Sequence, residues 1–385
     1  MKLRREFLKV LYSGLAILQF PELLLAASNP SDFFVICDDS GQPQLNTQND
    51  FVAAVPSFLK LWQFGTEKIE LFDLPFVGHS IAQNPTKPSE IAIFSRWGDQ
   101  SAILNLKDKK DIRIIKEEKN HRFFGHGLYS KDGKRLFTSG RDDMKKTGEI
   151  VVRDTQSLKV ISRFSAYGRY PYELQFANSE SEIVVAVAAE FKDVKHEKIS
   201  DPHFSENSNF TTIKSINGNF VKIVKLEDDE FSLMHFQISS DGWMVGVGSA
   251  NERDTSEKKS LAIAVSPAGK IKTLKISDDF QGSFFGETLG VTLFEKKSLV
   301  YITNPSNKLI LVWNYKTQDL AKYFYIPDRP KAISITSDQK QIIVAETKTK
   351  SFLMIDSTKM EIIGRAPGNE LSGYGAHLLR LKNFS

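Results

Sequence analysis

Short apolar runs recur along this chain of 385 residues, separated by polar turns. The segment from His126 reads His-Gly-Leu-Tyr-Ser-Lys-Asp-Gly-Lys-Arg-Leu-Phe-Thr-Ser. The segment from His235 reads His-Phe-Gln-Ile-Ser-Ser-Asp-Gly-Trp-Met-Val-Gly-Val-Gly, with its Asp and Gly at the same offset. Each segment therefore predicts two strands joined by a tight turn.

Seven such units follow one another, at intervals of about 45 residues with two longer ones, as β-propeller blades do. Their first strands are predicted to begin near His79, His126, Tyr172, His235, Leu289, Ala332 and His377. The second strands, such as 182–188 and 341–345, are nearly continuous apolar runs, which indicates that both of their faces are covered. The pattern predicts an all-β, seven-bladed β-propeller.

The seventh unit is short, because the chain stops soon after Leu381. We expect segments 32–39 and 58–62 to supply its missing strands, so that N- and C-terminal strands close the ring and leave no free sheet edge. One propeller domain over residues 30–385 follows. The long third interval predicts an insertion at about 191–220, a loop or hairpin carrying His196 and His203.

The N-terminus has the pattern of an export signal. Lys2, Arg4, Arg5 and Lys9 precede an apolar stretch that ends at small residues 26–28. The run Arg4-Arg-Glu-Phe-Leu-Lys resembles the twin-arginine consensus. We therefore expect residues 1–27 to be a twin-arginine-type signal peptide and the protein to be periplasmic. An ordinary secretory signal and a retained anchor stay open as alternatives, and no other segment is apolar enough to span a bilayer.

The composition argues against several classes of function and of site. A net charge of +4 gives no case for nucleic-acid binding. The single cysteine, Cys37, excludes a disulfide framework and a cysteine-based zinc site. We expect a monomer.

The repeat also predicts where the chemistry lies. The first strand of each propeller blade is innermost, so residues at its start approach the mouth of the central channel. His79, His126, His235 and His377 share this position, and Tyr172 with Glu173 takes it in a further unit. Residues that follow the second strands should approach the same face, which adds three candidates: Arg96, Arg141 and Glu190.

Three hypotheses account for these residues. Imidazoles from separate blades form a site for a transition metal such as iron or copper. Alternatively, the histidines are hydrogen-bonded in a water-filled polar channel, or Arg96 and Arg141 bind an anionic ligand. The remaining histidines, His121, His196 and His203, fall outside the repeat and are expected in loops.

Two stretches stand out within one blade: Phe123-Phe-Gly-His-Gly-Leu-Tyr-Ser-Lys-Asp-Gly-Lys-Arg-Leu-Phe and Gly148-Glu-Ile-Val-Val-Arg-Asp. They resemble a bacterial family catalogued as domain of unknown function 1513. The family's Gly-x-x-Pro-His-Glu-Leu appears as Gly168-Arg-Tyr-Pro-Tyr-Glu-Leu, with Tyr172 in place of the histidine. The resemblance implies an exported propeller. Because family members are often encoded near imelysin-like iron-uptake proteins, it also implies a connection with iron.

The sequence thus favours an exported ligand-binding or interaction module that acts at the channel mouth. A role in metal uptake, with components of a periplasmic iron-uptake system as partners, is the specific form of this hypothesis. The alternative is a periplasmic enzyme at the same mouth, either a lactonase-type hydrolase or an oxidoreductase.

Overall fold

The structure is a computed structural model. It describes residues 32–39, 44–45, 51–52, 57–96, 98–177, 179–189, 199–227, 231–250, 262–276, 286–347, 351–367 and 377–385.

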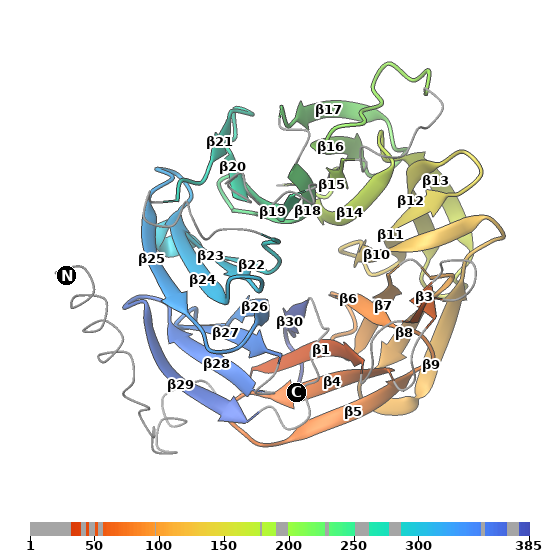
Figure 1. Cartoon of the computed structure of the whole chain (residues 1–385). Helices are drawn as coiled ribbons and strands as arrows, with labels where there is room; N and C mark the ends of the chain where they lie inside the picture. Colours follow the sequence, from red (N-terminus) through yellow and green to blue (C-terminus); the bar gives the residue numbers. More distant parts are fainter. Residues whose placement is uncertain are drawn as a thin grey trace.

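Seven four-stranded antiparallel sheets are arranged as blades around a central axis, which confirms the predicted propeller (Figure 1). The innermost strands are β6 (Gly78–Gln83), β10 (His121–Tyr129), β14 (Tyr170–Phe176), β18 (Phe231–Ile238), β22 (Val291–Phe294), β26 (Pro330–Ile335) and β30 (Leu378–Arg380). The second strands are β7 (Glu90–Ser95), β11 (Arg135–Asp142), β15 (Glu182–Ala188), β19 (Met244–Ala250), β23 (Leu299–Asn304), β27 (Gln341–Glu346) and β1 (Phe33–Asp39).

The outer half of each blade is a second hairpin. The third strands are β8 (Gln100–Asn105), β12 (Thr147–Asp154), β16 (Asn209–Lys214), β20 (Ala262–Val265), β24 (Leu309–Asn314), β28 (Ser351–Asp356) and β4 (Ser57–Gln63). The outermost strands are β9 (Asp108–Lys116), β13 (Val160–Ser165), β17 (Phe220–Lys225), β21 (Ile271–Thr273), β25 (Leu320–Tyr325), β29 (Glu361–Pro367) and β5 (Ile69–Leu74).

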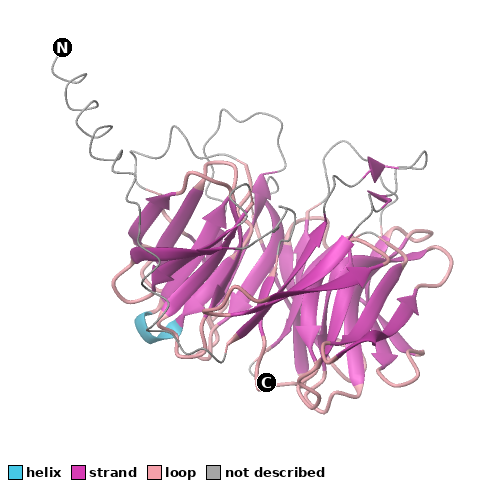
Figure 2. Ribbon diagram, turned by 90° about the horizontal axis from the view of Figure 1, so that it is seen from below, coloured by secondary structure: helices cyan, strands magenta, loops and turns pink. Residues whose placement is uncertain are grey.

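Little lies outside the blades in the part of the chain that the structure describes. The two-residue strands β2 (Gln44–Leu45) and β3 (Phe51–Val52) pair with each other, and η3 (Glu295–Lys297) is a short 3-10 turn. No helix among these residues has the length and apolar character needed to cross a bilayer. In side view, the strands run between the two faces of the ring (Figure 2).

Neighbouring blades are held together by apolar side chains on both faces of their middle strands. One cluster joins the blades of β22 and β26, another joins those of β10 and β14, and a third joins β6–β9 to the closing blade. On the other side of the closing blade, the Trp62 ring stacks on Phe352 with centroids 4.2 Å apart. This two-sided burial explains why the second strands are continuous apolar runs instead of alternating ones.

The closing blade combines the two ends of the described chain, in the order β30-β1-β4-β5. Val35 of β1 pairs with Leu379 of β30. This pairing confirms the prediction that N- and C-terminal strands together close the ring. The side chain of Gln83 adds a second connection: its amide nitrogen donates to the carbonyl of Lys382 at 2.9 Å, and its oxygen accepts from the Lys382 amide at 2.7 Å. The ring is therefore closed by backbone pairing on one side of β30 and by this side chain close to it.

The repeated Ser/Asp turn has a structural role. Ser130 donates to Asp132 at 2.6 Å, Ser239 donates to Asp241 at 2.6 Å, and a third blade repeats the contact from Thr336 to Asp338. Each carboxylate thereby orders the turn between first and second strands. The constant aspartate of the repeat belongs to blade construction and not to a binding site.

The prediction of an insertion at 191–220 is wrong for the C-terminal part of this range. Residues 209–214 form β16 and Phe220 begins β17, so both belong to the regular blade. The polar composition of Asn209-Phe-Thr-Thr obscured this strand, although Phe210 and Thr211 are buried between blades. His196 lies outside the described residues.

Candidate functional site

The innermost strands contain β-bulges at the positions that carry the candidate residues. The register of β6 shifts between Gly78 and Ser80, which leaves His79 in the bulge. That of β10 shifts between Phe123 and Gly127, around His126, and that of β18 shifts immediately before His235. A bulge re-aims a side chain and interrupts pairing, so these strands turn their histidines toward the axis.

The four repeated histidines converge into one group, named here the histidine cluster: His79, His126, His235 and His377. Their ligand nitrogens all lie within 4.8 Å of one another. The Nε2 atoms of His126 and His377 are 3.0 Å apart, so one ring donates its N–H to the other. Three come from β6, β10 and β18, and His377 immediately precedes β30. The structure thus brings together residues separated by up to about 300 positions along the chain.

The cluster is largely buried and only partly hydrogen-bonded. His79, His126 and His235 are buried, and His377 is half-buried. Nε2 of His79 and both ring nitrogens of His235 have no hydrogen-bond partner. A buried polar atom without a partner costs free energy, and such atoms mark positions where an ion or water is missing or where chemistry takes place.

Burial also fixes the charge of these rings. It is the main cause that lowers the pKa of His79 and His126 well below the usual value, and neighbouring rings lower the pKa further. Burial lowers the pKa of His235 and His377 to about 3, with smaller effects from Arg96. The four imidazoles are consequently neutral near pH 7, which is the state in which imidazole binds a metal ion.

Glu173 is the acidic neighbour of the cluster. Its Oε2 atom lies 3.6 Å from Nδ1 of His235 and accepts a hydrogen bond from the amide of Phe236 at 3.0 Å. Its other oxygen, Oε1, accepts from the side chain of Gln175 at 3.1 Å. Burial raises the pKa of Glu173, while the amide bond and Gln175 lower it. The carboxylate is therefore fixed beside one ring of the cluster.

The other predicted site residues have different surroundings. Tyr172 is buried, with its ring centroid 6.0 Å from His126 and 6.3 Å from His235. Arg96 and Phe124 form an isolated antiparallel β-bridge through their backbones. The positive charge of Arg96 lowers the pKa of all four cluster histidines. Glu190 lies outside the described residues.

Arg141 is directed elsewhere. Its guanidinium lies over the Tyr170 ring at 4.8 Å, and its Nε atom is 3.6 Å from Asp143. Arg141 is therefore engaged by Tyr170 and Asp143, whereas Arg96 acts on the pKa values of the cluster.

The remaining described histidines are engaged away from the cluster. His121 begins β10 instead of lying in a loop, because β10 pairs with β11 as far as Asp142. Its Nδ1 is 2.8 Å from a carboxylate oxygen of Glu149. His203 does lie in a turn, where its ring stacks on Phe220 with centroids 3.9 Å apart.

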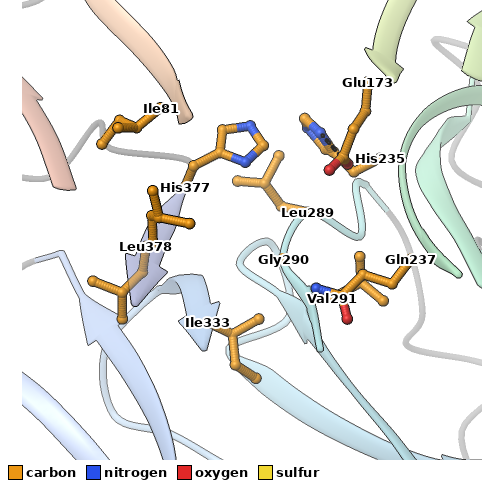
Figure 3. Close-up of a pocket in the computed structure, with 11 residues that line it drawn as sticks. Ile81, Glu173, His235, Gln237, Leu289, Gly290, Val291, Ile333, His377 and Leu378 are labelled. Atoms are coloured by element: carbon orange, nitrogen blue, oxygen red, sulfur yellow. Dashed lines mark ion pairs between the residues drawn. The ribbon is translucent and has the colours of Figure 1, made fainter. Parts of the chain in front are cut away.

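A cavity of about 140 Å³ adjoins the cluster. Figure 3 shows the rings of His377 and His235 at one end of it, with Glu173 beside His235 (Figure 3). Gln237 lines another part of its wall. Nothing in the sequence marks Gln237 as a site residue, because its position on the cavity wall follows only from how β18 packs beside β22.

Gly125, within the Phe-Gly-His-Gly motif, is a further residue of the site that the sequence pattern alone did not reveal. Its φ of +92° is unfavourable for residues with a side chain, and a Cβ there would be 2.7 Å from Cδ2 of His79. The absence of a side chain at Gly125 therefore permits both the bulge of β10 and the position of the His79 ring.

Replacing Gly125 tests this steric role. Gly125→Ala is expected to lower the free energy of unfolding by about 1–3 kcal/mol, from backbone strain together with the contact to His79. The matched control is Gly269→Ala, with a similar φ of +80° but open space around the added Cβ. Urea unfolding of both variants measures the difference, and equal losses of stability would contradict the contact with His79.

Comparisons with known proteins agree with the fold. A chain of the Kuenenia stuttgartiensis hydrazine synthase matches with a TM-score of 0.60 at 14% identity, covering 78% of this chain and 92% of that one. A chain of a crystal structure of the mitotic checkpoint complex matches with a TM-score of 0.55 at 8% identity, covering 76% of this chain and 78% of that one. At these identities the likeness extends to the fold alone.

Sequence comparisons give the family. A search of curated proteins returns no match. The family model described as "Protein of unknown function (DUF1513)" matches residues 72–375, which run from β5 to just before the last member of the histidine cluster. The chain belongs to this family.

Proposed function

We propose that the protein is an exported metal-binding module whose histidine cluster holds one first-row transition metal ion, iron or copper. The observation that carries the proposal is the convergence of four histidines from separate blades, with ligand nitrogens within 4.8 Å of one another. Imidazole suits iron, copper, zinc and nickel.

The spacing of the nitrogens is compatible with such an ion. For metal–nitrogen bonds of about 2.0–2.1 Å, ligand nitrogens are about 3.4 Å apart in a tetrahedral site and about 4.2 Å across a square-planar one. The range from 3.0 Å, between His126 and His377, to 4.8 Å brackets these values. Side-chain movements of less than about 1 Å would complete the site.

The electrostatic environment also supports a cation. Four neutral rings present lone pairs without charge repulsion, whereas Arg96 opposes a positive ion. Glu173 carries the opposite charge, and its position near Nδ1 of His235 matches a common arrangement at metal sites. In that arrangement a carboxylate accepts the N–H of a ligating imidazole and directs the opposite nitrogen to the metal.

Export is the second part of the proposal. Its support is the sequence alone: residues 1–27 carry the twin-arginine-type run at Arg4 and Arg5, and they lie outside the described residues. Twin-arginine substrates cross the membrane folded, which is compatible with a site that assembles from all around a closed ring. A periplasmic location and partners in an iron-uptake system belong to this proposal.

Among the described residues, the cavity beside the cluster favours the enzyme alternative, because it offers a reactant a place next to the proposed metal site. A lactonase-type or oxidoreductase activity would use that space, and assays with lactones and electron acceptors test it directly.

Metal analysis tests the main proposal. Protein purified from its native compartment is expected to contain about one iron or copper ion per chain, and His126→Ala and His235→Ala are each expected to reduce occupancy by about tenfold or more, since each removes a ligand. Elemental analysis measures this. The matched control is His203→Ala, which removes a histidine that stacks on Phe220. Occupancy unaffected by both cluster changes would overturn the proposal, provided that thermal unfolding shows the variants to be folded.

The role of the carboxylate is tested separately. Glu173→Gln keeps the size of the side chain and removes its charge, so metal affinity should fall by about 10–100-fold. Competition with a chelator measures the dissociation constant, and the thermal stability of the metal-free variant should stay close to that of the unchanged protein. Unaltered affinity would show that Glu173 does not orient His235.

The export signal is tested by Arg4→Lys combined with Arg5→Lys, since the twin-arginine pathway requires its arginine pair. The doubly changed chain should remain in the cytoplasm at the length of the precursor, as measured by cell fractionation and immunoblotting. Lys9→Arg, which keeps the charge and the arginine pair, is the control. Continued export of the double variant would indicate the ordinary secretory route.

A further inference from the structure

The histidine cluster has different surroundings on its two sides along the channel. Three residues that lie two positions after a cluster histidine line the cavity of about 140 Å³, namely Ile81, Gln237 and Leu379. Residues two positions apart in a strand point to the same side of it. The cavity therefore continues from the cluster toward the ends of the innermost strands, and Figure 3 shows His235 and His377 at one end of it.

On the side where the innermost strands begin, the cluster is flanked by apolar side chains. Phe124 and Met234 precede the cluster histidines of β10 and β18, and they pack together with Tyr172 and Ala188. All four side chains are buried, and the Tyr172 ring lies 6.0 Å from that of His126. Closely packed apolar side chains disfavour the passage of a hydrated ion on this side.

The cavity, in contrast, suits water and cations. It is partly open to solvent, and its exposed lining is mainly polar. Its volume is sufficient for several water molecules, since each occupies about 30 Å³ in the liquid. Among the described residues that line it, Glu173 is the only one with an acidic side chain. An ion that arrives from solvent through the cavity would therefore meet this carboxyl group beside His235.

Glu173 can contact an ion without losing its present partners. Its Oε2 atom accepts one hydrogen bond from the amide of Phe236, and Oε1 accepts one from Gln175. A carboxylate has about four acceptor positions on its two oxygens, so about two remain for a cation. Because Oε2 also lies 3.6 Å from Nδ1 of His235, an ion held by this carboxylate is next to a ring of the cluster.

We propose that this cavity is the route by which a hydrated divalent metal ion enters and leaves the histidine cluster, with Glu173 as a transient ligand on the way. The ion exchanges part of its water for an oxygen of Glu173 and then exchanges further water for the imidazole nitrogens. The released water returns to the cavity. The inference rests on the proposed function, since it requires a metal site in the cluster, and it adds how that site is filled.

Narrowing the cavity tests the route. The side chain of Leu289 projects between its two ends in Figure 3, so Leu289→Phe adds volume there. The change should slow both the loading of Cu²⁺ and its removal by a chelator by about tenfold, because both directions cross the same barrier. The dissociation constant should therefore stay within about twofold of that of the unchanged protein.

Stopped-flow absorption at the copper band measures these rates. Protein purified from its native compartment and stripped of metal is mixed with copper sulfate, and competition with a chelator gives the dissociation constant. Ile161→Phe, on the exposed part of β13, is the matched control and should change neither the rates nor the constant.

A second variant tests whether negative charge in the cavity assists the ion. Gln237→Glu adds a carboxylate to the wall and keeps an oxygen for the amide of Leu293, which now donates to Gln237 at 3.1 Å. Negative charge in a cleft raises the local concentration of cations, so loading should become about threefold faster or more at low salt. The gain should shrink at about 1 M salt, where the screening length is about 3 Å.

The outcomes separate the route from the metal site. Phe124→Leu loosens the apolar side and should leave the loading rate unchanged. Faster loading in this variant, together with an unchanged rate in Leu289→Phe, overturns the route and leaves the metal site standing. If Leu289→Phe alters the dissociation constant as well, Gln237→Glu decides, and loading that is no faster at low salt overturns the route. Copper that does not bind the unchanged protein overturns the metal site and the route together.

Discussion

Convergence of the innermost strands on one axis is the constraint from which the properties of the site follow. Seven sheets share a ring, so the residues at equivalent positions of their first strands must face one another at short range. Histidines that are far apart along the chain thereby come within 4.8 Å. The blades bury the rings, and burial lowers the pKa of each ring and so keeps the rings neutral near pH 7. The short distances between the histidine rings and their neutral state thus both follow from the ring of blades.

The same constraint explains why the bulges matter. In a regular strand, alternate side chains point to opposite faces of the sheet, and both faces of a propeller blade are buried against neighbours. A side chain on an innermost strand can point toward the axis where the strand pairing is interrupted, as at His79 and around His126. Gly125 is part of this interruption, since its positive φ and missing side chain leave room for the neighbouring ring. The site therefore depends on local irregularity within a regular fold.

The sequence predicted the fold more fully than the site. Continuous apolar strands and the repeated Ser/Asp turn depend on burial and local hydrogen bonding, so they are visible in the order of residues. The equivalence of the four histidines was visible for the same reason. Gln237 and Leu289 line one cavity only because β18 packs beside β22, and Arg141 contacts Asp143 and Tyr170 instead of pointing to the axis. Such relations depend on packing between blades, which periodicity does not encode. The polar strand β16 was assigned to an insertion because its buried threonines do not resemble a core sequence.

The reciprocal hydrogen bonds between Gln83 and the backbone of Lys382 have a consequence for the order of assembly. They join the first complete blade along the chain to the strand that closes the ring, and His377 immediately precedes that strand. A nascent or partly folded chain can form most blades and still lack one quarter of the histidine cluster. The cluster is complete only when the two ends of the propeller have met. A complete cluster accordingly distinguishes a finished ring from an open one.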